Sequence, residues 1–292
     1  MEKKKLIVGI PKGSLQEHTM KIFRAAGFSP QVSDRGYIVP TADSAIQCIL
    51  LRAQEIPRYV SEGRLDAGIT GEDWIKETKA NVQEVADLRY SKHGIVKMKW
   101  VLAVPEDSPI ASVRDLEGKT IATEAVGIAN DYFKRKNIKA EVEFSWGATE
   151  IKPPLFADAI IDVTETGESL RANHLKIIDV VFESSTKLIA SREAWRNPWK
   201  QEKIKDIGMM LEGVVTGEET VNLIMHVPKR RLSRIFKILP LLKYPTVRKI
   251  TKPNFLDVSI SCKKTEVRKL VFRLKVLGCT DLVEFPANAI VP

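Results

Sequence analysis

The alternation of strand-like and helix-like segments limits this 292-residue chain to an α/β fold. Short apolar runs alternate with amphipathic stretches whose apolar positions repeat every three to four residues, which is typical of parallel sheets covered by helices. The first pair is "LIVGI", residues 6–10, and "SLQEHTMKIFRAAG", residues 14–27. We expect this first helix to begin with a capping box of Ser14 and Glu17 and to end at Gly27.

The alternation occurs a second time, and the chain then returns to its first part. A second series of strands and helices begins near Trp100. After it, residues 175–191 are predicted to form two strand pieces that lead back, and residues 192–213 to form one helix despite Pro198. This return predicts two lobes. We place the first lobe at residues 1–97, completed by about 184–217, and the second lobe at residues 98–183.

From Val221 the order of elements changes to strand, helix, strand, strand, helix, strand. This is the βαββαβ order of a ferredoxin-like domain, which we place at residues 218–292. The order of elements does not by itself assign a function to such a domain. The predicted fold is therefore α/β, with a two-lobed part like that of periplasmic binding proteins and a C-terminal ferredoxin-like domain.

The net charge of +9 is concentrated at the C-terminal end of the chain. From Val221 onward there are 15 Lys and Arg residues against 4 Asp and Glu residues, whereas the preceding part has 31 against 33. The basic stretch lacks the interleaved aromatic residues that are typical of single-strand nucleic-acid binders. We interpret it as a solvated face and expect no nucleic-acid partner.

The cysteines and the apolar runs indicate the compartment. Cys48, Cys262 and Cys279 are far apart in the sequence, which argues against a disulfide framework and a zinc site. No apolar run is long enough to cross a membrane, and the N-terminal run is shorter than a signal-peptide core. We therefore expect a cytoplasmic protein with no membrane partner.

Two acids lie in a strand that is otherwise apolar, within "ADAIIDVTETGESL", residues 157–170. Alternation along a strand places Asp158 and Asp162 on the same face. Burying both carboxylates under a helix would cost several kcal/mol. A face that borders a cleft removes this conflict, because ribose hydroxyls or Mg²⁺-bound water can then contact the carboxylates.

The strand is followed by Thr166, Gly167, Glu168 and Ser169, just before a helix-like stretch. Hydroxyl groups, a glycine that lets successive N–H groups turn inward, and a helix start are together typical of a phosphate site. A Ser/Thr-rich turn with solvated acids is the structural alternative, and the segment alone does not decide between the two.

Two further strand-to-helix loops have similar chemistry. "GIPKGSL" places Lys12 and Gly13 at the carboxyl end of a strand, where α/β proteins bind ligands, although a simple turn with an exposed lysine has the same sequence. "GITGEDW" contains Gly71 and Asp73, and this acid can also serve only to stabilise the helix start. Arg52 ends an apolar run and needs an anionic partner, either a ligand phosphate or an internal carboxylate.

These stretches together resemble one known family. The segment "ADAIIDVTETGESLRANHL" resembles the phosphoribosyl-pyrophosphate (PRPP) signature of the ATP phosphoribosyltransferases. The resemblance continues through "PKGSL", "LRAQEIPRYVSEGRLDAGITGEDW", "VLAVPEDSPI", "GKTIATE", "WGATE" and "LIASREAW". With its C-terminal βαββαβ unit, the chain is similar to the long form of the family.

The resemblance implies a reaction, a cofactor and partners. In the family, N1 of the adenine of ATP displaces pyrophosphate from C1 of PRPP in the first step of histidine biosynthesis, with Mg²⁺ on the pyrophosphate. No covalent enzyme intermediate is needed, and catalysis is expected to depend on positioning and charge stabilisation. The long form further implies dimers and hexamers, and a C-terminal domain that binds histidine as a feedback inhibitor.

The resemblance also implies roles for individual residues. The catalytic residues would be Lys12, Glu150 and Asp162. The residues expected to contact PRPP are Asp158, Asp162, Glu165, Thr166, Gly167, Glu168, Ser169 and Leu170. Of these, Asp158 and Asp162 are also possible ligands of Mg²⁺. The residues expected to contact ATP are Lys12, Gly13, Arg52, Gly71 and Asp73. Thr246 and Asp257 are candidates for histidine contacts. At position 168 the family more often has a small or hydroxyl residue, whereas this chain has Glu168. We expect the extra negative charge of Glu168 to point to solvent.

Two other functions are compatible with parts of the sequence. A non-catalytic two-lobed protein that binds a phosphorylated small molecule would have the same architecture. A basic regulatory module that binds RNA through the C-terminal domain would account for the charge. Turnover of ATP and PRPP separates both from the enzyme.

Overall fold

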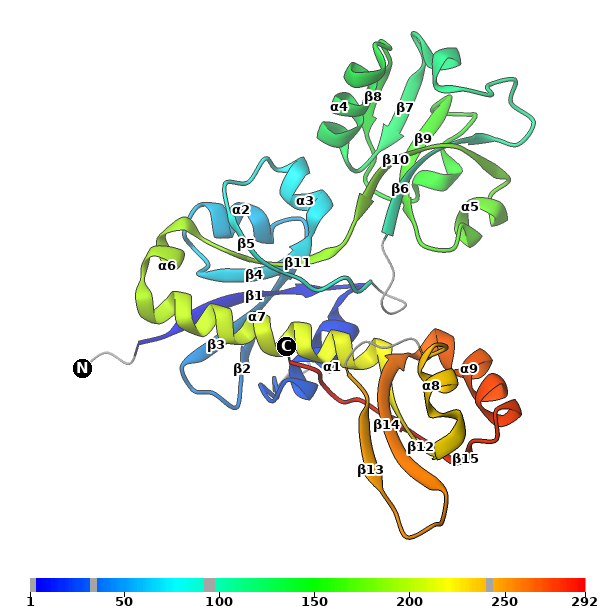
Figure 1. The fold of residues 1–292 in the computed structure, drawn as a ribbon. Coiled ribbons are helices and arrows are strands. Elements are labelled where there is room, and N and C mark those ends of the chain that lie inside the picture. Colours follow the sequence, from blue (N-terminus) through cyan, green and yellow to red (C-terminus); the bar gives the residue numbers. More distant parts are fainter. Residues whose placement is uncertain (1–3, 32–35, 92–97, 240–243, 292) are drawn as a thin grey trace. The chain divides into compact units, whose positions relative to one another are not determined.

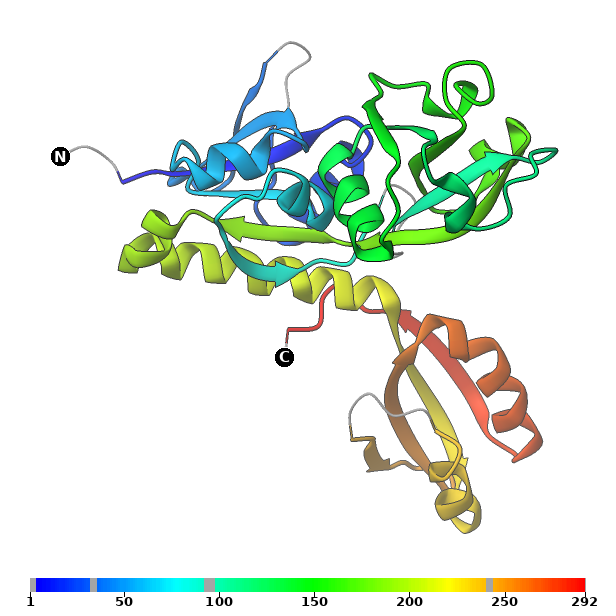
Figure 2. The same ribbon diagram turned by 90° about the horizontal axis from the view of Figure 1, so that it is seen from above.

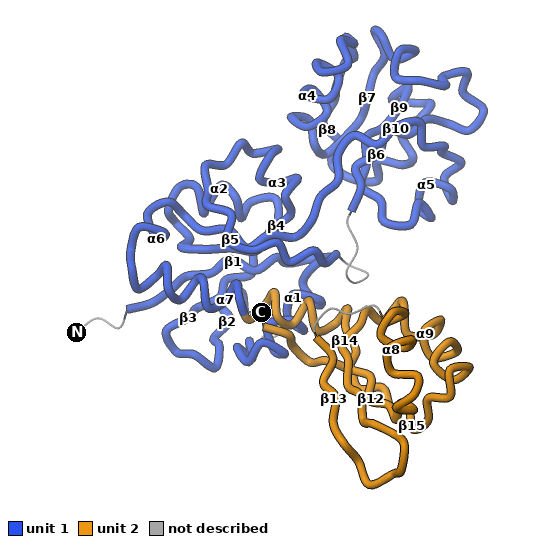
Figure 3. Tube along the Cα trace, in the orientation of Figure 1, with its two compact units in different colours: residues 1–209 blue, residues 210–292 orange. Residues whose placement is uncertain are grey.

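The computed structural model describes residues 4–31, 36–91, 98–239 and 244–291. Its elements alternate between strands and helices for the first two-thirds of the chain, as Figure 1 shows. Contacts divide the chain into two compact units, Met1–Met209 and Met210–Pro292, coloured separately in Figure 3. The division falls within one long helix, and each unit is described by itself below.

The first unit contains two sheets, and the first of them has six strands in the order β2-β3-β1-β4-β11-β5. β1 is parallel to β3 and β4, whereas β11 is antiparallel to β4 and β5. A segment that follows the second sheet in sequence therefore lies inside the first sheet. The strands are β1 (Leu6–Lys12), β2 (Ile38–Pro40), β3 (Ile46–Arg52), β4 (Ala67–Gly71), β5 (Gln83–Asp87) and β11 (Thr186–Ala190).

Five helices accompany this sheet: α1 (Gln16–Ala25), α2 (Ile56–Ser61), α3 (Glu72–Glu77), α6 (Arg192–Arg196) and α7 (Pro198–Glu219). The predicted capping box of Ser14 and Glu17 is wrong, because α1 begins after Leu15 with no side-chain cap. The single helix predicted for residues 192–213 is also wrong. It is divided at Asn197, which is extended because a residue before proline avoids the helical region, and Pro198 then begins α7.

The second sheet has five strands in the order β10-β6-β9-β7-β8. β7 is parallel to β8 and β9, and β6 is antiparallel to β9 and β10. Its elements are β6 (Met98–Pro105), β7 (Thr120–Thr123), α4 (Val126–Lys136), β8 (Glu141–Phe144), β9 (Ala159–Thr164), α5 (Glu168–Ala172) and β10 (Leu175–Ser184), with two 3-10 turns at Val113–Leu116 and Thr149–Ile151. A buried cluster that includes Leu102, Ile121, Phe133 and Ile161 holds α4 against the sheet.

A single residue separates the strands that join the two sheets. β10 ends at Ser184 in the second sheet, and β11 begins at Thr186 in the first. Only Ser185 lies between them, so one nearly continuous strand serves both sheets. The two lobes predicted from the returning pattern are confirmed. Each lobe is a sheet with its own helices, and the segment β10–β11 contributes a strand to both sheets.

The C-terminal unit contains a four-stranded sheet in the order β13-β14-β12-β15, seen from two directions in Figures 1 and 2. Its elements are β12 (Thr220–Pro228), a 3-10 turn (Lys229–Arg231), α8 (Leu232–Phe236), β13 (Thr246–Lys249), β14 (Phe255–Lys263), α9 (Lys264–Val276) and β15 (Thr280–Pro286). Leu223 and Met225 alternate inward from β12 to meet Ile260 of β14 and Leu270 of α9. The predicted ferredoxin-like fold is confirmed.

None of the helices in the part of the chain that the structure describes combines the length and apolarity needed to span a lipid bilayer.

The start of β4 is tied to two other segments of the first unit by Asp66. Its carboxylate accepts hydrogen bonds from the backbone N–H of Ile7, at 2.9 Å, and from Lys200 Nζ, at 2.6 Å. Because this carboxylate is buried, its two donors would lose their partner together if it were removed.

Asp66→Ala is therefore expected to lower the free energy of unfolding by about 2 kcal/mol, since it leaves a partly buried N–H and a half-buried ammonium unpaired. Urea denaturation followed by circular dichroism measures the change. Glu202→Ala, at an exposed position of α7, is the control and should shift the midpoint little. Equal effects of the two changes would contradict the role assigned to Asp66.

Candidate active site

The loop after β9 is organised by its own hydroxyl groups. The N–H of Gly167 donates to Thr164 Oγ1 at 2.8 Å, and the N–H of Glu168 donates to Thr166 Oγ1 at 3.4 Å. Gly167 has φ +75°, a conformation that glycine adopts without strain. A guanidinium N–H of Arg171 donates to the Thr166 carbonyl at 3.0 Å. The curved backbone of the loop is therefore held by hydrogen bonds within the segment Thr164–Arg171.

The ends of this loop differ in exposure. Glu168 is exposed, as predicted, so its charge points to solvent. The Leu170 side chain is buried beside Ala157 and Ile160 in a small apolar cluster. Leu170 can therefore reach a ligand only with its backbone, a restriction that the sequence motif did not indicate.

The charges of two other carboxylates act on Asp162 beside the loop. Burial raises the pKa of Asp162 to about 7, and the negative charges of Glu150 and Glu124 raise it further, against a hydrogen bond from the Val163 N–H that lowers it. Glu150 also accepts a hydrogen bond from the Ser169 hydroxyl of the loop. The acids and the loop therefore form one polar region at the carboxyl ends of β7 and β9.

Glu124 was missed by sequence reasoning. It directly follows β7, the parallel neighbour of β9, so its position at the same sheet edge as Asp162 could have been inferred from the strand order. The strand order itself was not available from the sequence.

Asp158 lies apart from this region. It precedes β9 and lies four positions before Asp162, which is about 13 Å along an extended strand. Its carboxylate accepts hydrogen bonds from Lys119 Nζ at 3.1 Å and from the Thr120 N–H at 2.9 Å. The structure does not bring the two aspartates together, because Asp158 instead connects the starts of β7 and β9.

The residues predicted in the first lobe meet at another sheet edge. Lys12 and Arg52 are register partners at the ends of β1 and β3. Gly13 has φ +112°, and a Cβ there would lie 3.4 Å from an Arg52 guanidinium nitrogen. Lys12 Nζ lies 4.3 Å from the centre of the Tyr37 ring. Among the described residues no carboxylate lies within 4.0 Å of either cation, so the internal acid considered for Arg52 is not found.

Asp73 of α3 is buried and connects the first lobe to the second. Its carboxylate accepts hydrogen bonds from Trp100 Nε1 of β6 at 2.8 Å and from the Ser184 hydroxyl of β10 at 2.9 Å. Burial raises the pKa of Asp73, while these hydrogen bonds lower it. A Cβ at Gly71 would collide with this carboxylate, so the close approach requires glycine.

The helix α3 supplies a second contact between the lobes. The Glu77 carboxylate accepts hydrogen bonds from the backbone N–H groups of Gly127, at 2.8 Å, and Ile128, at 2.9 Å, in the first turn of α4. Trp74 packs edge to face on Trp100, with ring centres 5.9 Å apart. An acid from the first lobe thus caps a helix of the second.

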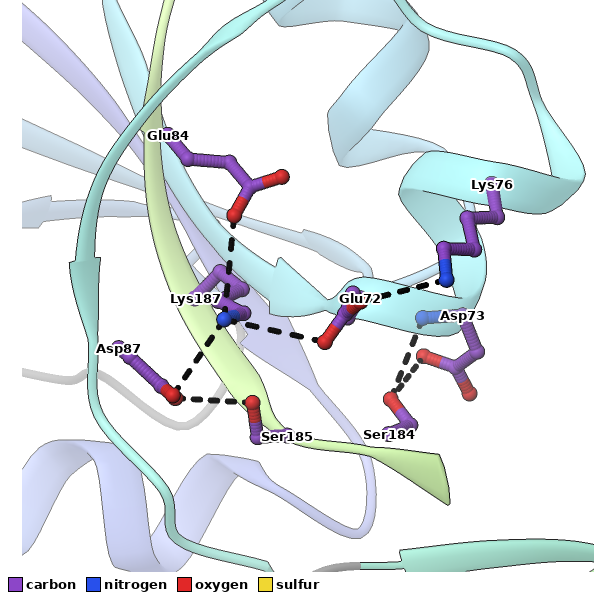
Figure 4. Close-up of polar contacts among 8 residues, drawn as sticks. All are labelled: Glu72, Asp73, Lys76, Glu84, Asp87, Ser184, Ser185 and Lys187. Atoms are coloured by element: carbon purple, nitrogen blue, oxygen red, sulfur yellow. Dashed lines mark hydrogen bonds and ion pairs between the residues drawn. The ribbon is translucent and has the colours of Figure 1, made fainter. Parts of the chain in front are cut away.

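A cluster of charges surrounds the strand that joins the lobes, as Figure 4 shows. Lys187 of β11 is 12% exposed and lies 3.4 Å from a carboxylate oxygen of Asp87. The carboxylates of Glu72 and Glu84 lie 3.7 and 3.8 Å from its ammonium nitrogen. The Ser185 hydroxyl donates to Asp87 at 2.8 Å. These contacts fix the residue at which the chain passes from one sheet to the other.

Comparison with known proteins identifies the family. The family model described as ATP phosphoribosyltransferase matches residues 52–213, and the model for the HisG C-terminal domain matches residues 218–289. The chain belongs to the ATP phosphoribosyltransferase family. This family assignment makes the chain a transferase of the first step of histidine biosynthesis, as the resemblance of its motifs indicated.

Individual relatives cover the whole chain. An ATP phosphoribosyltransferase of Thermodesulfovibrio yellowstonii is 50% identical over 292 residues, 100% of both chains. One from Chlorobaculum parvum is 49% identical over 98% of this chain and 97% of its own. In the ATP phosphoribosyl transferase (HisG:HisZ) complex of Thermotoga maritima, a chain of 26% identity matches with a TM-score of 0.62, over 72% of this chain and 98% of that one.

Asp162→Asn is expected to stabilise the protein relative to wild type above pH 7. The carboxyl pKa rises from its usual 3.8 to about 7 on folding, so ionisation of Asp162 opposes the folded state. Its contribution to stability is present below about pH 4 and is lost as the pH rises through 7. The stability difference between variant and wild type should therefore grow between pH 4 and 7 and then level off.

Urea midpoints of both proteins between pH 4 and 9, without substrates, measure this difference. Asp131→Asn removes an exposed acid of α4 and serves as the control. A constant difference between Asp162→Asn and wild type across the range would show that the carboxyl group is not perturbed.

Proposed function

We propose that the loop Glu165–Leu170 binds the 5′-phosphate of PRPP while the chain transfers the phosphoribosyl group to N1 of ATP. The observation that carries this assignment is the loop itself, which is curved at Gly167 and lies beside the Asp162 and Glu150 carboxylates. Backbone N–H groups and hydroxyls are suited to phosphate oxygens. The adjacent acids are suited to ribose hydroxyls, which donate hydrogen bonds to carboxylates.

The reaction forms a bond between adenine N1 and C1 of the ribose and breaks the bond from C1 to pyrophosphate oxygen. The bonding electrons leave with pyrophosphate, and positive charge develops on C1. Carboxylates close to that carbon stabilise this charge. We assign this role to Asp162 and Glu150, and add Glu124 because its charge acts on the same region. None of these groups forms a covalent bond with the substrate.

The cations of the first lobe are assigned to ATP. Lys12 and Arg52 are exposed and lie at the ends of neighbouring strands, where each can contact phosphate oxygens. Gly13 lets the backbone approach them. Gly71 and Asp73 are assigned to the same side, with Asp73 acting through its hold on the lobes, because its carboxylate is buried and bonded to Trp100.

Mg²⁺ is proposed to enter with the pyrophosphate group of PRPP. The described part of the chain has no group of three or more His, Cys, Asp or Glu side chains arranged to hold a metal ion. Asp158, one of the two predicted ligands, is bonded to Lys119. These residues therefore do not fit a resident metal, and the ion is treated as part of the substrate.

Lys12→Ala and Arg52→Ala are each expected to raise the KM for ATP at least about tenfold, because each removes a charge-assisted contact to phosphate. Asp162→Asn should lower kcat about tenfold or more while changing the KM for ATP little. The assay mixes protein, ATP, PRPP and Mg²⁺ and follows the ultraviolet absorbance of the adenine, with reversal by added pyrophosphate. Lys5→Ala, at the exposed residue that directly precedes β1, is the control.

Variants that remain within a few-fold of wild type would overturn the residue assignments. A wild-type chain that binds both substrates but forms no pyrophosphate-reversible product would instead support the non-catalytic binding protein considered above.

The C-terminal domain is proposed to bind histidine as a feedback inhibitor, in a chain that forms dimers and hexamers. Thr246 is exposed on β13 and lies opposite Ser259. Asp257 is half-buried on β14 between Arg248 and His226. Both positions present polar groups on neighbouring strands of one sheet, which is suited to a zwitterionic amino acid.

Histidine is expected to inhibit turnover, and Thr246→Ala or Asp257→Asn should raise the concentration needed for half inhibition about tenfold. Rates without histidine should change little, since these residues lie outside the catalytic lobes. Sedimentation velocity with and without histidine follows the oligomer. Inhibition that competes with ATP and is unchanged in both variants would place histidine elsewhere.

A further inference from the structure

The C-terminal domain contains a basic cavity that no part of the proposed reaction uses. It lies where β12 ends and β14 begins, at the register pair of Pro228 and Phe255. The strands β12 and β14 are labelled in Figure 1. Its volume is about 570 Å³, in the range of small-molecule sites. The lining residues used below are Lys229, Arg230, Arg231, Asn254, Phe255 and Gly278.

Three consecutive cations line this cavity. No carboxylate lines it, and within the described ranges no acid lies within 4.0 Å of Lys229, Arg230 or Arg231. Arg231 has one weak internal partner, the Val276 carbonyl at 3.4 Å. Three adjacent positive charges repel one another, so an anion that binds them all removes this repulsion.

Asp281 of β15, the strand that pairs with β12, is already neutralised. Asp281 accepts from Lys252 Nζ at 3.1 Å and pairs with His226 Nδ1 at 2.7 Å. These partners and the Thr280 hydroxyl lower the pKa of Asp281 to about 2, so it remains ionised and bound to them. Its charge is therefore not available to the three cations.

An aromatic ring and an amide side chain also line the cavity. Phe255 is half-buried, and Lys252 Nζ lies 4.5 Å from the centre of its ring. Asn254 is exposed and can both donate and accept hydrogen bonds. Gly278 brings the backbone close to the cations, since a Cβ there would lie 3.3 Å from an Arg231 guanidinium nitrogen. Inorganic phosphate alone would contact neither the Phe255 ring nor the Asn254 amide.

From this arrangement we infer that the cavity binds a nucleoside di- or triphosphate. The phosphates contact Lys229, Arg230 and Arg231, and the base lies toward Phe255 and Asn254. All of these residues belong to the C-terminal domain, so the site is additional to the ATP site proposed at Lys12 and Arg52. Such a site lets this domain respond to nucleotide concentration independently of whether the proposed ATP site at Lys12 and Arg52 is occupied.

Photolabelling of the full-length protein with 8-azido-ADP, followed by peptide mapping, tests this inference. Label is expected on the peptide that contains Asn254 and Phe255, and ADP should compete for it better than pyrophosphate, with adenosine weaker still. The Lys229→Ala/Arg230→Ala/Arg231→Ala variant should need about tenfold more ADP for half protection. The control, Lys264→Ala/Arg268→Ala/Lys269→Ala, removes three exposed charges from α9 and should behave as wild type.

The outcomes separate this site from the proposed function. Labelling at Phe255 should persist in the Lys12→Ala/Arg52→Ala variant, whether or not that variant turns over substrate. Label confined to residues 4–91, or an equal loss of protection in the two triple variants, would overturn the inference. Equal competition by pyrophosphate and ADP would show a simple polyphosphate site without base recognition, and protection by RNA but not by ADP would show a nucleic-acid surface; either result overturns a nucleotide site.

Discussion

The buried carboxylate of Asp73 is the interaction on which the geometry of the two lobes depends. It binds Trp100 of β6 and Ser184 of β10, so a helix that begins in the first lobe is hydrogen-bonded to two strands of the second. Without these donors the buried carboxylate would be strongly unfavourable, because burial penalises its charge. The capping of α4 by Glu77 acts in the same direction. Lys12 and Asp162 lie at sheet edges in different lobes. The junction between these lobes is held by specific polar contacts in addition to apolar packing.

The two lobes have opposite electrostatic character where their candidate residues lie. Lys12 and Arg52 present positive charge at the carboxyl ends of β1 and β3, whereas Glu124, Glu150 and Asp162 present negative charge beside the loop after β9. A reaction between two polyanions needs cations to hold the phosphates, and a carbon that becomes positive needs anions. Each set of charges thus suits a different part of the same reaction.

Local patterns predicted the fold better than the site. Burial alternates along β12 and is continuous along β4, so both strands could be recognised from their own residues. The partners of Asp73 and Glu77, in contrast, are Trp100 and the start of α4, which are 27 and 50 residues away in sequence. Strand alternation places Asp158 with Asp162 but contains no information about Lys119, which is 39 residues away and binds the Asp158 carboxylate. Long-range pairs of this kind leave no periodic signal, whereas a loop such as Thr164–Gly167 bonds to itself and is visible as a motif.

The raised pKa of Asp162 connects stability with catalysis. In the free protein, burial and the charges of Glu150 and Glu124 oppose the ionised form, so the acids are held together at a cost to folding. When positive charge develops on a substrate carbon beside them, the same proximity becomes favourable, and the carboxylates need no rearrangement to respond. A site that is electrostatically unfavourable when empty therefore interacts more strongly with the transition state than with the neutral ribose of the ground state, which is the condition for raising kcat rather than binding alone.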